Sequence, residues 1–293
     1  MKKILLIINP SSGRAKIQTE LLNVIKEFNK NNFETNVQIT LAPKHAIEIV
    51  KNANNIDAII CSGGDGTLNE IITGLINANK NIPIGYIPAG STNDFAMTFG
   101  LPLNILDATK QIINGTPRAI DIGQFNKDRY FSYVASFGAF SSVSYSTPQP
   151  VKNTLGHLAY VFNGIADIGN IKPYTVKITT HNDVYKDDFV FGAILNTTSV
   201  GGLIKLDNIN VDLQDGLFEV ILVKTPKTLT DLNDILYGIS NVDFSNNIFK
   251  FIKTDKLTLE FTDPPNWALD GEEAKGTKKV EILNLNKKIK IIK

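Results

Sequence analysis

The sequence lacks the features that mark exported and membrane-spanning proteins. It contains a single cysteine, Cys61, so no disulfide bond can form within the chain, and a reducing cytoplasm is the expected environment. The apolar run Ile4–Ile8 stops at Asn9 and Pro10, which makes it too short for an export signal or a transmembrane helix. We therefore expect a cytoplasmic protein without a membrane-spanning segment.

Net charge is also small. The 30 Lys and Arg residues nearly balance the 29 Asp and Glu residues, and the formal charge is +1. Such a chain creates no overall field that attracts nucleic acid, so we expect no nucleic-acid partner. Only three residues are arginines (Arg14, Arg118 and Arg129), which is too few for an arginine cluster around phosphate groups.

What the sequence does contain is the composition of a folded globular protein. It is 43% hydrophobic and 20% charged over 293 residues, a length that favours two domains. In the first third, short apolar runs such as Asp57–Cys61 and Ile82–Ile87 alternate with segments of helical period. This alternation predicts an α/β domain with a parallel-type sheet over residues 1–121.

The second part of the sequence has a different pattern. Short apolar and aromatic clusters separated by turn residues predict strands, with His181–Asp183 as a hairpin tip. Helices are expected around Leu155–Ile168 and Leu229–Ile239. We therefore expect a mainly antiparallel β-sandwich domain over residues 122–283, and a tail of about residues 284–293 that returns as a strand to the first domain.

The most informative segment is Cys61–Glu70, between an apolar strand and a helix with a strong apolar face. Its glycines, Gly63, Gly64 and Gly66, let backbone amides approach a phosphate group, and the positive end of the helix favours negative charge. Asp65 would repel phosphate unless something lay between them, which indicates a magnesium ion or a water shell that bridges the carboxylate to phosphate. The spacing matches neither a P-loop nor a dinucleotide-binding fingerprint. A tight turn that merely uses glycine is the alternative.

Two further loops strengthen the hypothesis of a phosphate site. Asn9–Gly13 and Pro88–Asp94 follow other predicted strands and supply glycine and small polar side chains. Because the carboxyl ends of parallel strands share one edge of a sheet, the three loops together predict a nucleotide site. An ordinary capped turn is the alternative for each loop alone. Thr67 and Glu70 also have the spacing of a capping box at the start of the helix.

A fourth element, Trp267–Glu273, lies in the second half of the sequence. As part of a kinase site, Asp270 would accept the proton of an attacking hydroxyl group and Glu272 would help to position it. Asp-Gly after a short apolar stretch is equally the sequence of a hairpin turn, so that interpretation stays open.

Taken together, Asn9–Gly13, Gly63–Glu70, Gly90–Asp94 and Asp270–Glu272 resemble the diacylglycerol kinase catalytic-domain family, and most closely its bacterial soluble lipid kinases. The resemblance covers nearly the whole chain. It implies a two-domain kinase of phospholipid metabolism that transfers the γ-phosphoryl group of ATP to a lipid hydroxyl group, with diacylglycerol and phosphatidic acid as the expected substrate and product. It further implies transient peripheral contact with the inner face of the membrane, and it allows a homodimer.

The resemblance also implies roles for individual residues. Asp65 and Asp94 would organise the magnesium ion and water of the active site. Asp270 and Glu272 would form the catalytic acid pair, in which we favour Asp270 as the base. The nucleotide site would consist of Asn9, Pro10, Ser11, Ser12, Gly13, Thr40, Gly63, Gly64, Asp65, Gly66, Thr67, Leu68, Asn69 and Ser91.

A second magnesium site, of structural character, is implied by Leu213–Leu217. Its ligands would be the side chain of Asp215 and the carbonyl groups of Asp212 and Leu217. A hairpin leading into the next strand is a compatible alternative. Upstream, Ser199–Leu203 has two glycines where members of the family often have three, a departure that concerns the lipid-facing part rather than the phosphate loops.

Two other functions fit part of the pattern. A soluble-metabolite kinase of the NAD kinase type shares the Gly63–Thr67 string, but it does not account equally well for Asp270–Glu272. A nucleotide-binding regulator without catalysis would have no need for the acids Asp65, Asp94, Asp270 and Glu272. A lipid kinase is therefore the expected function.

Overall fold

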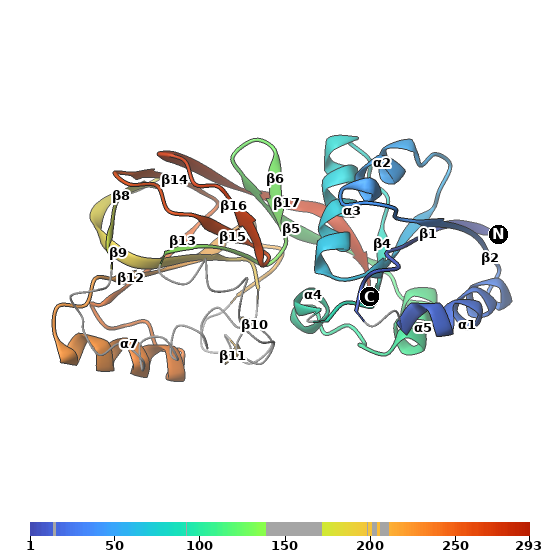
Figure 1. Ribbon diagram of the computed structural model, residues 1–293, viewed down its shortest axis with the longest axis horizontal. Helices are drawn as coiled ribbons and strands as arrows, with labels where there is room; N and C mark the ends of the chain where they lie inside the picture. The colour runs from blue at the N-terminus through green and yellow to red at the C-terminus, as the bar shows by residue number, and fades with distance from the viewer. Residues whose placement is uncertain (14–15, 92, 139–171, 198, 201–203, 206–210) are drawn as a thin grey trace. The chain divides into compact units, whose positions relative to one another are not determined.

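The structure is a computed structural model that describes residues 1–13, 16–91, 93–138, 172–197, 199–200, 204–205 and 211–293 (Figure 1). The chain divides into two compact units. Unit 1 consists of Met1–Ile120 and Lys287–Lys293, and unit 2 consists of Asp121–Asn286. The helix expected around Leu155–Ile168 lies outside the described residues. Within the described part, no helix is long and apolar enough to cross a membrane.

Unit 1 alternates strands and helices along the chain, as the sequence pattern predicts. Its elements are β1 (Lys2–Ile8), α1 (Lys16–Lys30), β2 (Phe33–Ile39), α2 (His45–Asn52), β3 (Ala58–Gly63), α3 (Asp65–Asn77), β4 (Ile84–Pro88), α4 (Asp94–Thr98) and α5 (Ile105–Asn114). Strand β1 lies between β2 and β3, and β4 pairs with β3, all in parallel. The final residues of strand β17 (Lys279–Ile292) add a further parallel strand beside β4.

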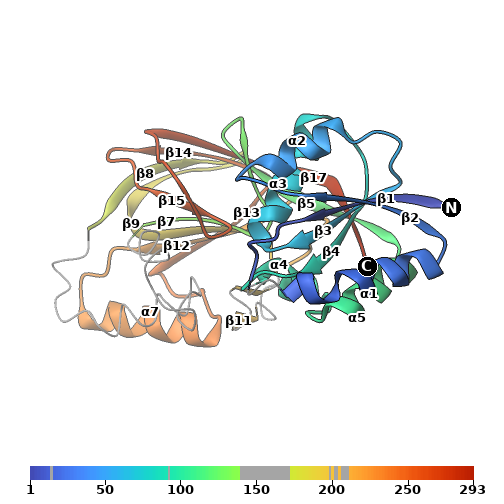
Figure 2. The same cartoon turned by 45° about the vertical axis from the view of Figure 1, so that its right-hand side comes forward.

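Helices cover both faces of this sheet (Figure 2). Alternate residues of β1, Ile4, Leu6 and Ile8, belong to the core cluster that includes side chains of α1 and α5. Helices α2 and α3 lie on the opposite face, and they pack so closely that a Cβ atom on Gly74 of α3 would lie 2.9 Å from Val50 Cβ of α2. The α/β prediction is thus confirmed: the apolar runs of β1, β3 and β4 supply two buried faces, and each face of the sheet has its own helices.

Unit 2 consists mainly of antiparallel strands. Its elements are β5 (Pro117–Phe125), which begins in unit 1, β6 (Arg129–Phe131), β7 (Val134–Gly138), β8 (Tyr174–Thr179), β9 (Val184–Leu195), β10 (Ser199–Val200), β11 (Ile204–Lys205), β12 (Phe218–Lys224), α7 (Leu229–Asn241), β13 (Phe249–Thr254), β14 (Lys256–Phe261), β15 (Trp267–Leu269), β16 (Glu272–Ala274) and β17. The helix expected at Leu229–Ile239 is α7, which begins with a capping box formed by Thr228 and Asp231.

The long strand β9 joins two layers of unit 2. Its first half pairs with β8, and β14, β17, β5 and β6 extend that layer. Its second half lies between β7 and β12, and β15, β16 and β13 extend the other layer. Aromatic rings fill the space between the layers, with Phe131 stacked on Phe218 and Phe137 against Phe261. This is the predicted β-sandwich arrangement.

The outer face of the second layer is covered by α7, whose Leu232, Ile235 and Ile239 join a separate core cluster (Figure 1).

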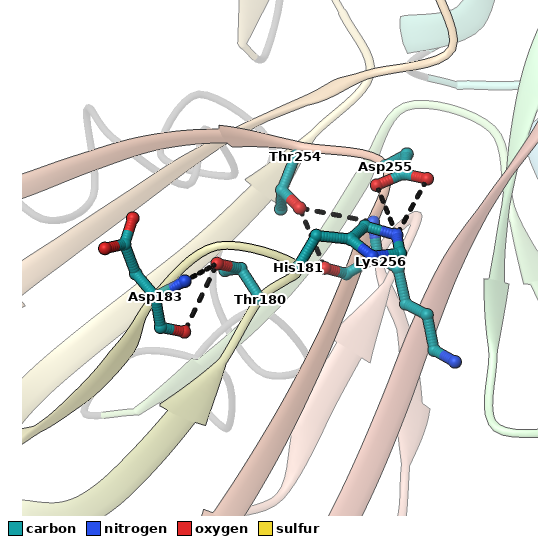
Figure 3. A network of polar contacts seen from close by, with 6 residues as sticks. All are labelled: Thr180, His181, Asp183, Thr254, Asp255 and Lys256. Atoms are coloured by element: carbon teal, nitrogen blue, oxygen red, sulfur yellow. Dashed lines mark hydrogen bonds and ion pairs between the residues drawn. The ribbon is translucent and has the colours of Figure 1, made fainter.

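In the first layer, β8 and β9 form the hairpin that the sequence predicts, with Thr179 opposite Val184. The tip residue His181 lies with its Nε2 atom 3.2 Å from Asp255 Oδ1, in the turn between β13 and β14 (Figure 3). Both side chains are largely exposed, so this contact contributes little to stability.

Candidate active site

Four loops of unit 1 follow the carboxyl ends of parallel strands and therefore share one edge of the sheet. Hydrogen bonds tie them to one another. The Asn9 side-chain amide donates to Thr67 Oγ1 over 2.9 Å, and the Gly64 amide donates to Ser12 Oγ over 3.2 Å. The amide of Thr40 donates to the carbonyl of Ile8 over 2.8 Å. The edge thus brings together the residues that the sequence assigns to the nucleotide site in unit 1.

Glycines permit the backbones of these loops to approach closely. A Cβ atom on Gly13 would collide with the carbonyl oxygen of Ala89, and Gly13 has a positive φ of 39°. A Cβ atom on Gly90 would lie 2.6 Å from Gly64 Cα and 2.8 Å from Asn93 Oδ1. The Asn9, Gly64 and Gly90 loops are therefore packed backbone against backbone, and the Gly64 and Gly90 amides donate to the side chains of Ser12 and Asn93.

Alanine at Gly90 is expected to destabilise the protein by about 1–3 kcal/mol, because its methyl group must displace the backbone at Gly64. The φ of Gly90 is not in the left-handed region, so the contact alone sets the cost. Chemical denaturation of the wild type and Gly90→Ala would measure the loss. Gly64→Ala, whose new Cβ would lie 3.3 Å from Gly90 Cα, should cost less. Equal losses would contradict this account of the packing.

The carboxylate of Asp65 lies at the first turn of α3 and binds the start of another helix. Its Oδ2 accepts from the Asp94 amide over 3.0 Å, and its Oδ1 accepts from the Phe95 amide over 3.2 Å. The buried hydroxyl group of Tyr86 lies 3.4 Å from the same Oδ1. Burial raises the pKa of Asp65, and these hydrogen bonds oppose the rise. Asp65 therefore holds the first turn of α4, which carries Asp94.

Asp94 is the second carboxylate at this edge. Burial, together with the charge of Asp65, raises the pKa of Asp94 to about 6. Its Oδ1 atom is buried and has no hydrogen-bond partner among the described residues. A buried oxygen of this kind beside another carboxylate is the type of ligand that Mg²⁺ prefers, so the residues present fit the expected ion.

Asparagine at position 94 is expected to stabilise the protein near neutral pH. The pKa of Asp94 is higher in the folded chain than in the unfolded chain, so this carboxyl group makes stability fall as the pH rises from about 4 to about 6. Asparagine, which is always neutral, removes that loss of about 3 kcal/mol. Melting curves at pH 7.5 should show a higher midpoint for Asp94→Asn, and the difference should vanish near pH 4. A gain of the same size at both values would contradict the assignment.

The helix α3 does not begin with the capping box that its sequence suggests. Its N-cap is Gly64, and Glu70 instead accepts hydrogen bonds from the amides of Lys44 and Ala46, at the start of α2. The prediction of a Thr67–Glu70 capping box is therefore wrong, because tertiary partners take both side chains. Thr67 accepts from Asn9.

The remaining residues assigned to the nucleotide site differ in what they can offer. The side chain of Leu68 is buried in the core, so only its backbone could face a ligand. Asn69 accepts a long hydrogen bond of 3.4 Å from the hydroxyl group of Thr73, and Ser91 is exposed. Tyr86 is the residue that sequence analysis missed. Its only signal was a phenol hydroxyl group near the end of an otherwise apolar strand.

In unit 2, Asp270 and Gly271 form the two-residue turn between β15 and β16, with φ values of 48° and 84°. The hairpin interpretation is thus confirmed. The carboxylate of Asp270 accepts from three backbone amides, those of Ser132, Tyr133 and Val134, at 2.5, 3.0 and 3.0 Å. Glu272 is exposed, and its Oε2 lies 4.0 Å from Arg129 Nη2.

The loop expected to hold a structural magnesium ion is organised by its own amides. Asp212 Oδ1 accepts from the Gln214 amide over 3.0 Å, and Asp215 Oδ1 accepts from the Leu217 amide over 2.9 Å. Asp215 Oδ2 lies 3.9 Å from the ammonium group of Lys253. Nowhere in the described part of the chain do three His, Cys, Asp or Glu side chains form a group that could hold a metal ion. The site at Asp212, Asp215 and Leu217 stays a prediction.

A buried acid beneath this loop was not expected from the sequence. Asp121 is fully buried, and its carboxylate accepts from the Gly216 amide over 2.7 Å and from the Asn286 side chain over 3.0 Å. The signal that could have found it is a lone Asp within the apolar strand β5, because a buried carboxylate needs dedicated donors.

Comparisons with known proteins agree with this architecture. Residues 3–125 match the sequence profile of the diacylglycerol kinase catalytic domain. The diacylglycerol kinase of Bacillus subtilis (strain 168) is 31% identical over 100% of this chain and 96% of its own, and that of Staphylococcus aureus (strain MRSA252) is 30% identical over 99% and 92%. A crystal structure from Bacillus anthracis, described as a candidate diacylglycerol kinase, superposes with a TM-score of 0.83 at 27% identity and covers 99% of this chain and 95% of the other.

The fold and these relationships define a kinase, an enzyme that transfers a phosphoryl group to an alcohol. The chain belongs to the diacylglycerol kinase family, as its four motifs indicated.

Proposed function

We propose that this protein transfers the γ-phosphoryl group of ATP to a hydroxyl group of a lipid, with diacylglycerol as the substrate and phosphatidic acid as the product. The observation that carries the proposal is the joined edge of unit 1, where the Asn9, Gly64 and Gly90 loops meet beside Asp65 and Asp94. The names of the relatives, which are diacylglycerol kinases, support the lipid acceptor.

In this proposal, backbone amides in the first turn of α3, at the positive end of that helix, bind the phosphates of ATP, and the packed glycine loops hold this turn in place. Asp94, in the turn of α4 that Asp65 holds, would bind Mg²⁺, which neutralises phosphate charge when bound. The hydroxyl oxygen of the lipid attacks the γ-phosphorus, and the bond to the β,γ-bridging oxygen breaks, so ADP leaves. Alignment and charge neutralisation, rather than covalent chemistry by the protein, supply most of the rate.

The proton of the attacking hydroxyl group requires an acceptor, and the sequence alone favours Asp270. The hydrogen bonds of unit 2 favour Glu272 instead. Three backbone amides already use the carboxylate of Asp270, whereas Glu272 is exposed next to it across the same turn. We therefore propose Glu272 as the general base and Asp270 as the residue that fixes the turn.

An assay with ATP labelled at the γ-phosphate and vesicles containing diacylglycerol tests the function. The wild type should place label in the organic phase as phosphatidic acid, and Asp65→Ala should not. Label confined to the aqueous phase, or NADP formed from added NAD, would overturn the lipid proposal in favour of a soluble-metabolite kinase. Flotation with the vesicles would test the transient membrane contact that a lipid acceptor requires.

A further inference from the structure

We propose that Glu70 is a positioning residue that holds the segment Thr40–Lys44 in place for nucleotide binding, an inference that rests on the proposed function. Glu70 lies on α3, one turn after Thr67. Its Oε1 accepts from the Lys44 amide over 2.8 Å, and its Oε2 accepts from the Ala46 amide over 3.2 Å. Both oxygens thus bind the backbone at the start of a different helix, α2.

The segment Thr40–Lys44 has few apolar anchors beyond its first residue, Thr40, whose side chain is buried. Leu41 is 83% exposed, and the preceding Ile39 is 49% exposed, so little apolar burial holds the chain here. Lys44 has a left-handed φ of 68° and, within the described residues, makes no side-chain capping bond to α2. Besides Glu70, further hydrogen bonds hold the segment: the Thr40 amide donates to the carbonyl of Ile8, the Leu41 amide donates to His45 Nδ1, and the carbonyl of Ala42 accepts from the His45 amide. Glu70 therefore supplies the cap that α2 lacks, and its charge suits the positive end of that helix.

This segment borders the nucleotide loops. Ile39 is paired with Ile8 in the parallel register of β1 and β2, so the residues that follow them, Thr40 and Asn9, are neighbours at the edge of the sheet. Asn9 in turn binds Thr67. Helix α3 is thus connected to the ends of β1 and β2 at two points. Thr67 binds Asn9, which follows β1, and Glu70 binds Lys44, at the end of the segment Thr40–Lys44 that follows β2. Loss of the second connection would free Thr40–Lys44 from α3 while the glycine loops stay in place.

The test measures ATP affinity by calorimetry in the presence of Mg²⁺, together with steady-state kinetics, on the full chain. Glu70→Ala should raise the Kd for ATP about tenfold, because two backbone amides lose their acceptor. Glu70→Gln, which keeps one acceptor oxygen, should have a smaller effect of the same sign. At saturating ATP, kcat should stay within about twofold of the wild type, since the bonds act on binding rather than on chemistry. Glu48→Gln, an exposed acid on α2, is the matched control and should bind ATP like the wild type.

Two results would overturn the inference. If the Glu70 variants melt at a lower temperature but bind ATP as tightly as the wild type, Glu70 is only a structural cap. If kcat falls while the Kd for ATP is unchanged, Glu70 acts on the chemical step. Glu70→Gln preserves the shape of the side chain, so it carries the test if Glu70→Ala does not fold. A wild type that binds no ATP would instead refute the proposed function itself, and with it the basis for this role of Glu70.

Discussion

Asparagine in place of Asp65 is expected to lower lipid phosphorylation by about a thousandfold, a size typical of the loss of one preorganised electrostatic group. The single oxygen of asparagine cannot replace both carboxylate oxygens, which accept from the Asp94 and Phe95 amides. Its amide nitrogen would face one of these donors instead. The start of α4 should therefore shift, and Asp94 would lose the position that the proposed magnesium site requires.

Turnover with ATP and diacylglycerol vesicles would measure this loss, and circular dichroism would show that the fold persists. Asp107→Asn, which removes a charge from an exposed position in the first turn of α5, is the control and should keep full activity. Retention of a tenth or more of the activity in Asp65→Asn would contradict the role that we assign to this carboxylate.

Glutamine at position 272 is expected to lower kcat by about a thousandfold and to leave the melting temperature unchanged. A general base contributes in this range, and the side chain is exposed, so its replacement costs little stability. The neighbouring substitution Asp270→Asn should behave in a different way. Asparagine tolerates the left-handed backbone at this position, but its amide group cannot accept from all three amides of Ser132–Val134.

The Asp270→Asn protein should therefore lose about 1–3 kcal/mol of stability, measured by chemical denaturation. Glu273→Gln, the next and also exposed residue, serves as the control for charge removal. An active Glu272→Gln enzyme combined with an inactive and fully stable Asp270→Asn enzyme would reverse the assignment and make Asp270 the base.

The fold could be predicted well because its patterns are local. In unit 1, β1, β3 and β4 carry apolar residues at both faces, and helices such as α5 carry one apolar stripe, so the alternation of β1 to α5 follows from residue spacing. In unit 2, the Asp270–Gly271 turn and the His181 hairpin were predictable because turn residues constrain the backbone by themselves. The joining of the two layers by β9 was not predictable, since the pairing of strands that are distant in sequence leaves no local signal in the sequence of either strand.

That the candidate loops of unit 1 share one edge of the sheet was predictable from the sequence, but the contacts of their side chains were not. The glycine loops and Asp65 follow from the chemistry of phosphate binding. The partners of Glu70 and Asp270 do not, because the amides that they bind lie 24 to 138 positions away along the sequence. A Thr-x-x-Glu spacing fits a capping box as well as it fits two unrelated long-range contacts, and only the packing of α2 against α3 decides between them.

The end of β17 has a consequence for biosynthesis. The strand beside β4 belongs to unit 1, although it follows all of unit 2 along the chain. The first 120 residues leave the ribosome long before that strand has been synthesised. Until then β4, whose residues are all buried in the finished protein, is an unpaired edge strand of the sheet. Nascent chains should therefore be vulnerable to aggregation at β4 until translation reaches Lys287–Lys293, and a fragment cut at residue 120 should keep that vulnerability permanently.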